Sequence, residues 1–151
     1  MVTHPLQTIS IAPIEVRVEP MLRIQGYKDI TRVRTKIKKI ASQMAKLSIH
    51  TFQPAVSFIV HDISNREGDR LVLGNGSEFH SPAFSHFLNQ CDQIATFVLT
   101  MGPAIDEQLK NFNDTDRLIE ALFLESASWL GLEHLTKQLV QLLRKTAIKN
   151  G

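Results

Sequence analysis

The chain has 151 residues, of which 43% are hydrophobic and 21% charged, with a formal net charge of +2. This length suits a single domain, residues 1–151, and the small net charge gives no reason to expect a nucleic-acid partner. No apolar run is long enough to cross a bilayer, the first residues lack the pattern of a secretory signal, and one cysteine cannot form an internal disulfide, so we expect a cytoplasmic protein without a membrane partner.

The first part of the chain predicts an extended segment followed by a helix. Residues 9–18 alternate partly in β-branched residues, which favours an edge strand interrupted at Pro13 and closed by Pro20. Asp29 is a good N-cap, and helical spacing of apolar residues follows it to Leu47. The other face of this helix is basic, with Arg32, Arg34, Lys36, Lys38, Lys39 and Lys46. Such a face can bind phosphates or an acidic partner, but a solvated surface is the simpler interpretation because no aromatic residues interleave.

Alternating short strands and helices are predicted in the middle of the chain. In order, we expect a strand at 54–63, a turn at 64–69, a strand at 71–73 ending in Gly74-Asn75-Gly76, a helix from Ser81-Pro82 to Leu88, a strand at 93–101 and a helix from Pro103 to about Phe112. The strand at 93–101 is the most uniformly apolar, which predicts a central place in its sheet.

A long helix is predicted to begin after Asn113 or Asp114 as N-cap and to run to the C-terminus. Its residues Leu118–Leu132 are apolar almost all round, which predicts burial on every side. A narrower apolar stripe then leads to the surface at Leu132, Leu135, Leu139, Leu142 and Leu143. This stripe indicates that the helix end packs either on another chain, as in a homo-oligomer, or on a C-terminal segment that is absent from this sequence. The sequence therefore predicts an α+β fold in which a mixed sheet and helices pack around one long, largely buried C-terminal helix.

Two places could carry chemistry. At Thr100-Met101-Gly102-Pro103 a strand turns through glycine into a helix, which exposes backbone N–H groups suited to anionic ligand groups, although many such turns are only structural. Glu133 interrupts the apolar helix, and either it pairs with Lys137 one turn later or it marks a binding site. The histidines and the single cysteine show no metal-ligand spacing, and no nucleophile motif occurs, so we expect no metal site and assign no catalytic residue.

Four segments resemble, in order, the activation domain of vitamin B12-dependent methionine synthase, and most closely its stand-alone versions. They are MLRIQGY at 21–27, LVLGNGSEF, SPAFSHFLNQCDQIATFVLTMGPAIDEQL and DTDRLIEALFLESASWLGLEHL, so the resemblance covers about residues 21–143. It implies an α+β domain that binds S-adenosylmethionine and docks over a cobalamin-bearing partner. Glu133 matches the acidic residue that holds this cofactor in the family, with Thr100–Pro103 near the same cleft.

The resemblance is not complete, and it leaves three functions open. The family's Arg-x-x-Pro-Gly-Tyr segment, which wraps the cofactor, does not occur after this helix. The chain is then either a methyltransferase-associated module for reactivating methionine synthase or a related corrinoid protein, or a non-catalytic module whose basic helix docks on a corrinoid or other partner. A third possibility is a small-molecule-binding domain that only shares the scaffold.

Overall fold

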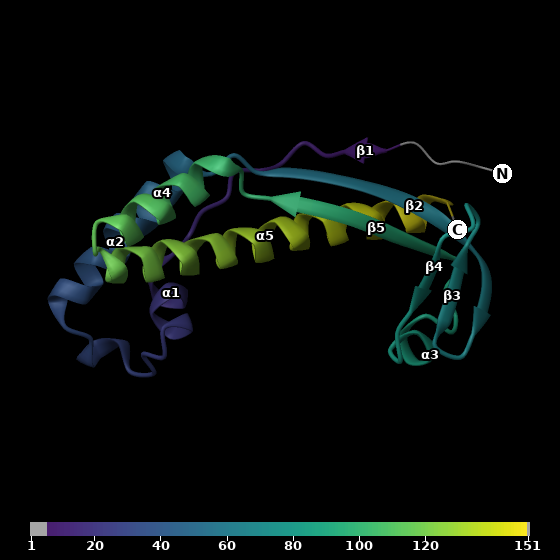
Figure 1. The fold of residues 1–151 in the computed structure, drawn as a ribbon, viewed down its shortest axis with the longest axis horizontal. Coiled ribbons are helices and arrows are strands. Elements are labelled where there is room, and N and C mark those ends of the chain that lie inside the picture. The colour runs from purple at the N-terminus through teal and green to yellow at the C-terminus, as the bar shows by residue number, and fades with distance from the viewer. Residues whose placement is uncertain (1–5, 151) are drawn as a thin grey trace. The chain divides into compact units, whose positions relative to one another are not determined.

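The computed structural model describes residues 6–150, with side chains to residue 148. Its elements are, in chain order, β1 (Gln7–Thr8), α1 (Val18–Ile24), the 3₁₀ turn η1 (Ile30–Arg32), α2 (Thr35–Thr51), β2 (Ala55–Glu67), β3 (Arg70–Leu73), β4 (Glu78–His80), α3 (Phe84–Phe87), β5 (Gln93–Thr100), α4 (Pro103–Asp114) and α5 (Leu118–Asn150) (Figure 1). This mixture of helices and strands, with one long helix at the end, confirms the predicted α+β class.

The chain folds as two compact units, which are described separately. The sheet unit contains β1 and Ser57–Val98, and the helical unit contains Ile9–Val56 with the chain from Leu99 onward. The helical unit is therefore discontinuous in sequence. The prediction of a single domain stays a prediction.

In the sheet unit, β2 is the strand with most neighbours. It pairs with β1, β3 and β5, and β4 extends the sheet beyond β3. The prediction that residues 93–101 form the central strand is wrong, because Phe97 and Val98 on β5 are 47% and 73% exposed. The β2 strand also runs on to Glu67, so the turn predicted for 64–69 contains only Gly68 and Asp69. The short strand β4 was not predicted.

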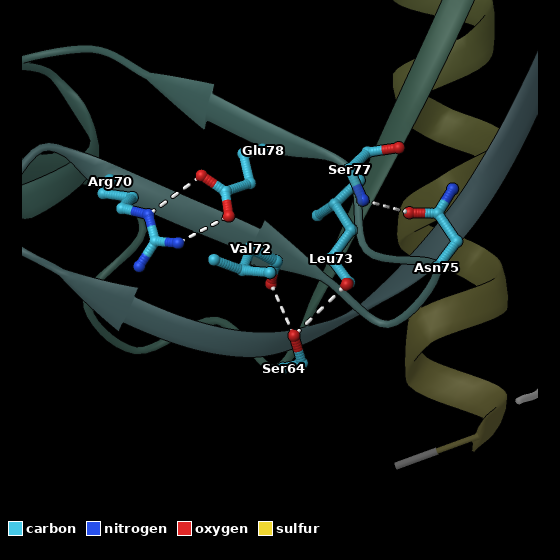
Figure 2. Close-up of polar contacts among 7 residues, drawn as sticks. All are labelled: Ser64, Arg70, Val72, Leu73, Asn75, Ser77 and Glu78. Carbon is cyan, nitrogen blue, oxygen red and sulfur yellow. Dashed lines mark hydrogen bonds and ion pairs between the residues drawn. The ribbon is translucent and has the colours of Figure 1, made fainter.

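A β-bulge in β2 is stabilised by the hydroxyl of Ser64. The pairing register between β2 and β3 shifts between Ile63 and Asn65, which disturbs the regular ladder of backbone hydrogen bonds. The Ser64 hydroxyl lies 3.1 Å from the carbonyl oxygen of Val72 and 3.2 Å from that of Leu73 (Figure 2). The Ser64 hydroxyl on β2 thus donates to backbone carbonyls of β3 where the ladder of backbone hydrogen bonds is irregular.

The β3–β4 hairpin contains the turn predicted at Gly74–Gly76. Gly76 has a φ of 85°, which favours glycine, and the side-chain oxygen of Asn75 accepts a hydrogen bond from the Ser77 N–H at 3.0 Å. Across the strands, the guanidinium of Arg70 makes two hydrogen bonds to the carboxylate of Glu78, one of them from Nε at 3.0 Å (Figure 2). The helix predicted from Ser81-Pro82 begins later, since Ala83 is the N-cap of α3 and α3 (Phe84–Phe87) is only one turn long.

The N-terminal part of the helical unit differs from the prediction. Residues 9–17 form no strand, although Ile14 and Val16 are buried. The side-chain amide of Gln138 on α5 accepts a hydrogen bond from the Ala12 N–H at 2.9 Å and donates one to the Ala12 carbonyl at 3.2 Å. Pro20 was expected to end the extended segment, but it lies in the first turn of α1. Proline is tolerated there because the N–H groups of the first turn have no partner within the helix.

The helix predicted from Asp29 begins six residues later. The Asp29 carboxylate accepts hydrogen bonds from the N–H and hydroxyl of Thr31, at 3.0 and 2.6 Å, and caps η1 instead. Helix α2 then starts at Thr35 and buries Ala41, Met44, Ala45 and Ser48. Its basic residues Lys36, Lys39 and Lys46 are exposed, as expected for a solvated face.

Helix α5 begins later than expected. Asn113 and Asp114 belong to the last turn of α4 and do not cap α5. The link is a tight turn in which the Arg117 N–H donates to the Phe112 carbonyl at 2.8 Å, and the Arg117 guanidinium lies 4.5 Å from the centre of the Phe112 ring. Asp116 adopts a φ of 55° in this turn. Both predicted N-caps therefore lie inside α4, and α5 begins at Leu118 after this turn.

One side of α5 is buried and the other is open. Leu124, Ala127, Leu135 and Leu139 have no exposed surface, so Leu135 and Leu139 do not lie in a surface stripe as predicted. The prediction of burial all round is wrong for Leu118, Leu122 and Trp129, which are 58%, 47% and 67% exposed. Among the helices of residues 6–150, none is long and apolar enough to cross a membrane.

Candidate functional site

The strand-to-helix turn Thr100–Pro103 is stabilised by a hydrogen bond within the turn. Gly102 is the N-cap of α4, and its N–H donates to the Thr100 hydroxyl at 3.0 Å. Pro103 has no N–H to offer. The Gly102 N–H is therefore already hydrogen-bonded and Pro103 has no N–H, so neither residue can donate to an anionic ligand group.

Gly102 is required by both conformation and space. Its φ is 89°, in the region that favours glycine. A Cβ at this position would lie 2.6 Å from the Cβ of Gln53 and 2.9 Å from its carbonyl oxygen. The Gln53 N–H in turn donates to the Met101 carbonyl at 2.8 Å. The residues just after α2 thus hold the turn in place.

Met101 points into the core of the helical unit. Its side chain is 4% exposed. A Cβ added to Gly131 would lie 2.7 Å from the Met101 methyl carbon and 3.0 Å from the Phe52 ring. Gly131 therefore allows Met101 and Phe52 to pack directly on the backbone of α5. Met101 has a packing role, whereas Thr100 and Pro103 are exposed.

Glu133 lies at a separate, charged hollow of about 500 Å³. The hollow is lined by Glu15, Val16, Arg17, Pro20, Leu130, Glu133, His134 and Lys137. It is formed where the segment leading into α1 passes α5, and both walls belong to the helical unit. A volume of this size is within the range of small-molecule sites.

The carboxylate of Glu133 is already paired. Lys137 Nζ lies 2.6 Å from it, as one of the two sequence interpretations predicted. The hydrogen bond and the positive charge of Lys137 hold the pKa of Glu133 below its ordinary value, so the group is ionised at neutral pH. Arg17 adds a second cation to the lining of the hollow. The hollow thus presents groups of both signs, as recognition of a zwitterionic ligand requires.

Glu15 and Arg17 were missed as candidate site residues. The sequence contains a signal for them, because the apolar residues Ile14 and Val16 alternate with the charged residues Glu15 and Arg17. In the structure the first pair is buried and the second is exposed. Alternation along an extended segment places the two charged side chains on one face. By itself this alternation predicts only a strand. A period of two shows which residues share a face, but it does not show which element they will meet.

The two predicted parts of the site do not meet. None of Thr100–Pro103 lines the hollow at Glu133. Met101 packs at Gly131, two residues before Glu133, and two residues correspond to about 200° of rotation around a helix. The turn and the carboxylate therefore lie on nearly opposite sides of α5, and we treat the hollow as the candidate site.

The sheet unit has a hollow of its own, of about 520 Å³, beside β2, β3 and α3. Its two cations are already engaged: Arg70 by Glu78, and Arg66 by the carbonyl oxygens of Leu88 and Asn89 at 3.0 and 2.7 Å. Within residues 6–150, no group of three or more His, Cys, Asp or Glu residues could hold a metal ion. The hollow at Glu133 therefore remains the stronger candidate.

Comparison with known proteins gives a likeness of fold. No protein-family model matches the chain, and no curated protein matches its sequence. Among solved structures, the chain is similar to the crystal structure of the MetH reactivation domain bound to AdoHcy, with a TM-score of 0.62 and 15% sequence identity. The match covers 94% of this chain and 56% of that chain. The chain therefore has a fold similar to that of part of the MetH reactivation domain.

Proposed function

We propose that this chain is an S-adenosylmethionine-binding module that supports reductive reactivation of a cobalamin-dependent methionine synthase or a related corrinoid protein. In that reaction the methyl group leaves the sulfonium sulfur for cobalt, a reductant supplies one electron, and AdoHcy is released. The observation that carries the proposal is the fold shared with an AdoHcy-bound reactivation domain over 94% of this chain. The cobalamin would be carried by the partner protein.

The chemistry of the hollow at Glu133 is compatible with this ligand. S-adenosylmethionine carries a sulfonium, an α-ammonium and an α-carboxylate. The ionised Glu133 can attract either cation, and Arg17 or Lys137 can pair with the carboxylate. Leu130, Val16 and Pro20 offer apolar surface to the remainder. Because Lys137 already pairs with Glu133, the ligand must share or replace that contact.

Isothermal titration of S-adenosylmethionine and of AdoHcy into the purified protein tests the proposal. We expect a dissociation constant in the micromolar range and a loss of about tenfold in affinity for Glu133→Gln, which removes a charge-assisted contact. Glu107→Gln is the matched control, because Glu107 is an exposed glutamate on α4 outside the hollow. Binding that is equal in all three proteins would exclude Glu133 from the site.

A second function is favoured by the basic face of α2. Lys36, Lys39 and Lys46 are exposed on one helix, and such a face suits an acidic partner, so the chain would be a non-catalytic module that docks on a corrinoid protein. The absence of heat with both ligands would favour this function. Binding to a purified cobalamin-bearing domain should then weaken in Lys36→Glu/Lys39→Glu and remain in Lys110→Glu, a change on α4.

A further inference from the structure

The ion pair between Glu133 and Lys137 has unused binding capacity on both of its members. Lys137 Nζ donates to Oε1 of Glu133 at 2.6 Å, and the side chains of Lys137 and Glu133 are 69% and 57% exposed. Among residues 6–148, no other group is hydrogen-bonded to either end of the pair. An ammonium group has three N–H donors and a carboxylate can accept on both oxygens, so two N–H groups of Lys137 and Oε2 of Glu133 are available to a ligand.

The amino-acid end of S-adenosylmethionine is complementary to this ion pair. Its α-ammonium and α-carboxylate are bonded to the same carbon atom, so the ligand offers one positive and one negative group side by side. When this end lies antiparallel to the ion pair, the ammonium meets Oε2 of Glu133 and the carboxylate meets the free N–H groups of Lys137. Each of the four charges then lies next to two charges of opposite sign, and the contact between Glu133 and Lys137 is kept.

The proposed methyl transfer favours the same end of the ligand. This step rests on the proposed function, in which the sulfonium methyl group must reach the cobalt of a partner protein. A sulfonium held against Glu133 would have less open surface for that partner. Charged contacts at the non-reacting end supply binding energy without covering the reacting atom.

The charges on the other wall of the hollow are less suited to this role. Glu15 and Arg17 are exposed, and in the part of the chain that the structure describes no ion pair joins them to each other. They are two positions apart on an extended segment, which separates their Cα atoms by about 7 Å. Their charges are therefore not assembled into a pair beforehand, whereas one turn of α5 fixes the spacing of Glu133 and Lys137.

We infer that the Glu133–Lys137 pair binds the zwitterionic amino-acid end of the ligand, and that Lys137 is the residue that binds its α-carboxylate. The charge on the sulfur then contributes little to binding, so S-adenosylmethionine and AdoHcy should bind with similar affinity. 5′-Methylthioadenosine keeps the adenosine and the thioether but lacks the amino-acid end. It should bind about a hundredfold more weakly, because two charge-assisted contacts are lost at about tenfold each.

Isothermal titration of AdoHcy and 5′-methylthioadenosine into variants of the full chain tests the assignment. Lys137→Gln should weaken AdoHcy binding about tenfold and leave the affinity for 5′-methylthioadenosine unchanged, a selective loss that a purely structural role of Lys137 does not produce. Lys137→Arg keeps the charge and the N–H donors and should retain most of the affinity for AdoHcy. Arg23→Gln is the matched control, because Arg23 pairs with Glu19 at 2.8 Å, also four residues apart and exposed, outside the lining of the hollow.

Titration with L-methionine, followed by NMR, separates this assignment from the proposed function. L-Methionine carries the same amino-acid end without the adenosine. A protein that binds L-methionine only when Lys137 is present, but binds neither adenosyl ligand, would contradict the proposed function and support the assignment. AdoHcy that binds Lys137→Gln as tightly as the wild type, or that loses affinity in Arg17→Gln instead, would overturn the assignment and leave the proposed function standing. A protein that binds none of these ligands contradicts both.

Discussion

The carboxylate of Glu133 and the ammonium of Lys137 lie 2.6 Å apart across one turn of α5, with both side chains more than half exposed. The hydrogen bond and charge of Lys137 lower the pKa of Glu133 from its ordinary value of 4.5. Because the lowered value belongs to the folded state, the pair stabilises the fold above the unfolded pKa and loses that effect as the pH falls through the folded pKa.

Lys137→Gln should therefore raise the pKa of Glu133 toward 4.5, as followed by carbon NMR of the carboxylate. The change in unfolding free energy should be small, because both groups are solvated. It should be present at pH 7 and diminish below pH 4.5. A pKa of Glu133 that stays low without Lys137 would identify another cation of the hollow, such as Arg17, as the cause.

Replacing Gly102 by alanine should destabilise the protein more than the same change at Gly26. Both glycines have a φ near 85°, but a Cβ at Gly26 meets nothing within 4 Å, whereas at Gly102 it would lie 2.6 Å from the Cβ of Gln53. We expect a loss of about 1 kcal/mol for Gly26→Ala, from backbone strain alone, and about 3 kcal/mol for Gly102→Ala. Denaturant unfolding measures both losses of unfolding free energy. Equal losses would show that Gln53, just after α2, can move away from the added Cβ at little cost.

The hydrogen bond between Gln25 and Ser126 should join α1 to α5. Gln25 Nε2 lies 2.8 Å from the Ser126 hydroxyl, and Ser126 is 1% exposed. Ser126→Ala should cost about 1 kcal/mol of unfolding free energy. In a double-mutant cycle with Gln25→Ala, the two losses should not add, because each variant removes the same bond. Additive losses would mean that the bond contributes nothing of its own.

Arg70→Lys should raise the pKa of Glu78 while the charge is kept. The hydrogen bonds from Arg70 are the largest cause of the lowered Glu78 pKa, ahead of its charge. A lysine cannot reproduce the two-pronged contact. We expect the Glu78 pKa to move toward its ordinary value, with Arg66→Lys as a control that leaves it unchanged. An unaltered pKa in Arg70→Lys would show that charge alone acts.

Local signals in the sequence were enough to place most elements. The turn at Gly74–Gly76, the start of α4 at Pro103, and the Glu133–Lys137 pair all depend on residues within a few positions of one another. The α+β class followed from the alternation of these elements. Where a prediction required only neighbouring residues, the physical chemistry of the chain was sufficient.

Predictions that required tertiary context were less successful. Asp29 is a genuine cap, but its side chain closes a 3₁₀ turn, and the sequence does not show how many turns follow a cap. The all-round apolar character of Leu118–Leu132 predicts burial only if enough chain exists to cover every side. Here the side of α5 that carries Leu118, Leu122 and Trp129 is left open. Glu15, Val16 and Arg17 line the hollow where their segment passes α5, and Gln138 on α5 is hydrogen-bonded to Ala12 of the same segment.

The interrupted order of the helical unit has a consequence for how the protein is made. Its first part ends at Val56, and its second part resumes at Leu99. During synthesis, α1 and α2 leave the ribosome long before α5, which supplies the contacts that bury them. Such long sequence separation slows folding and prolongs the exposure of apolar surface. The apolar faces of α1 and α2 therefore stay exposed until α5 is synthesised, which makes the nascent chain a candidate for binding by chaperones.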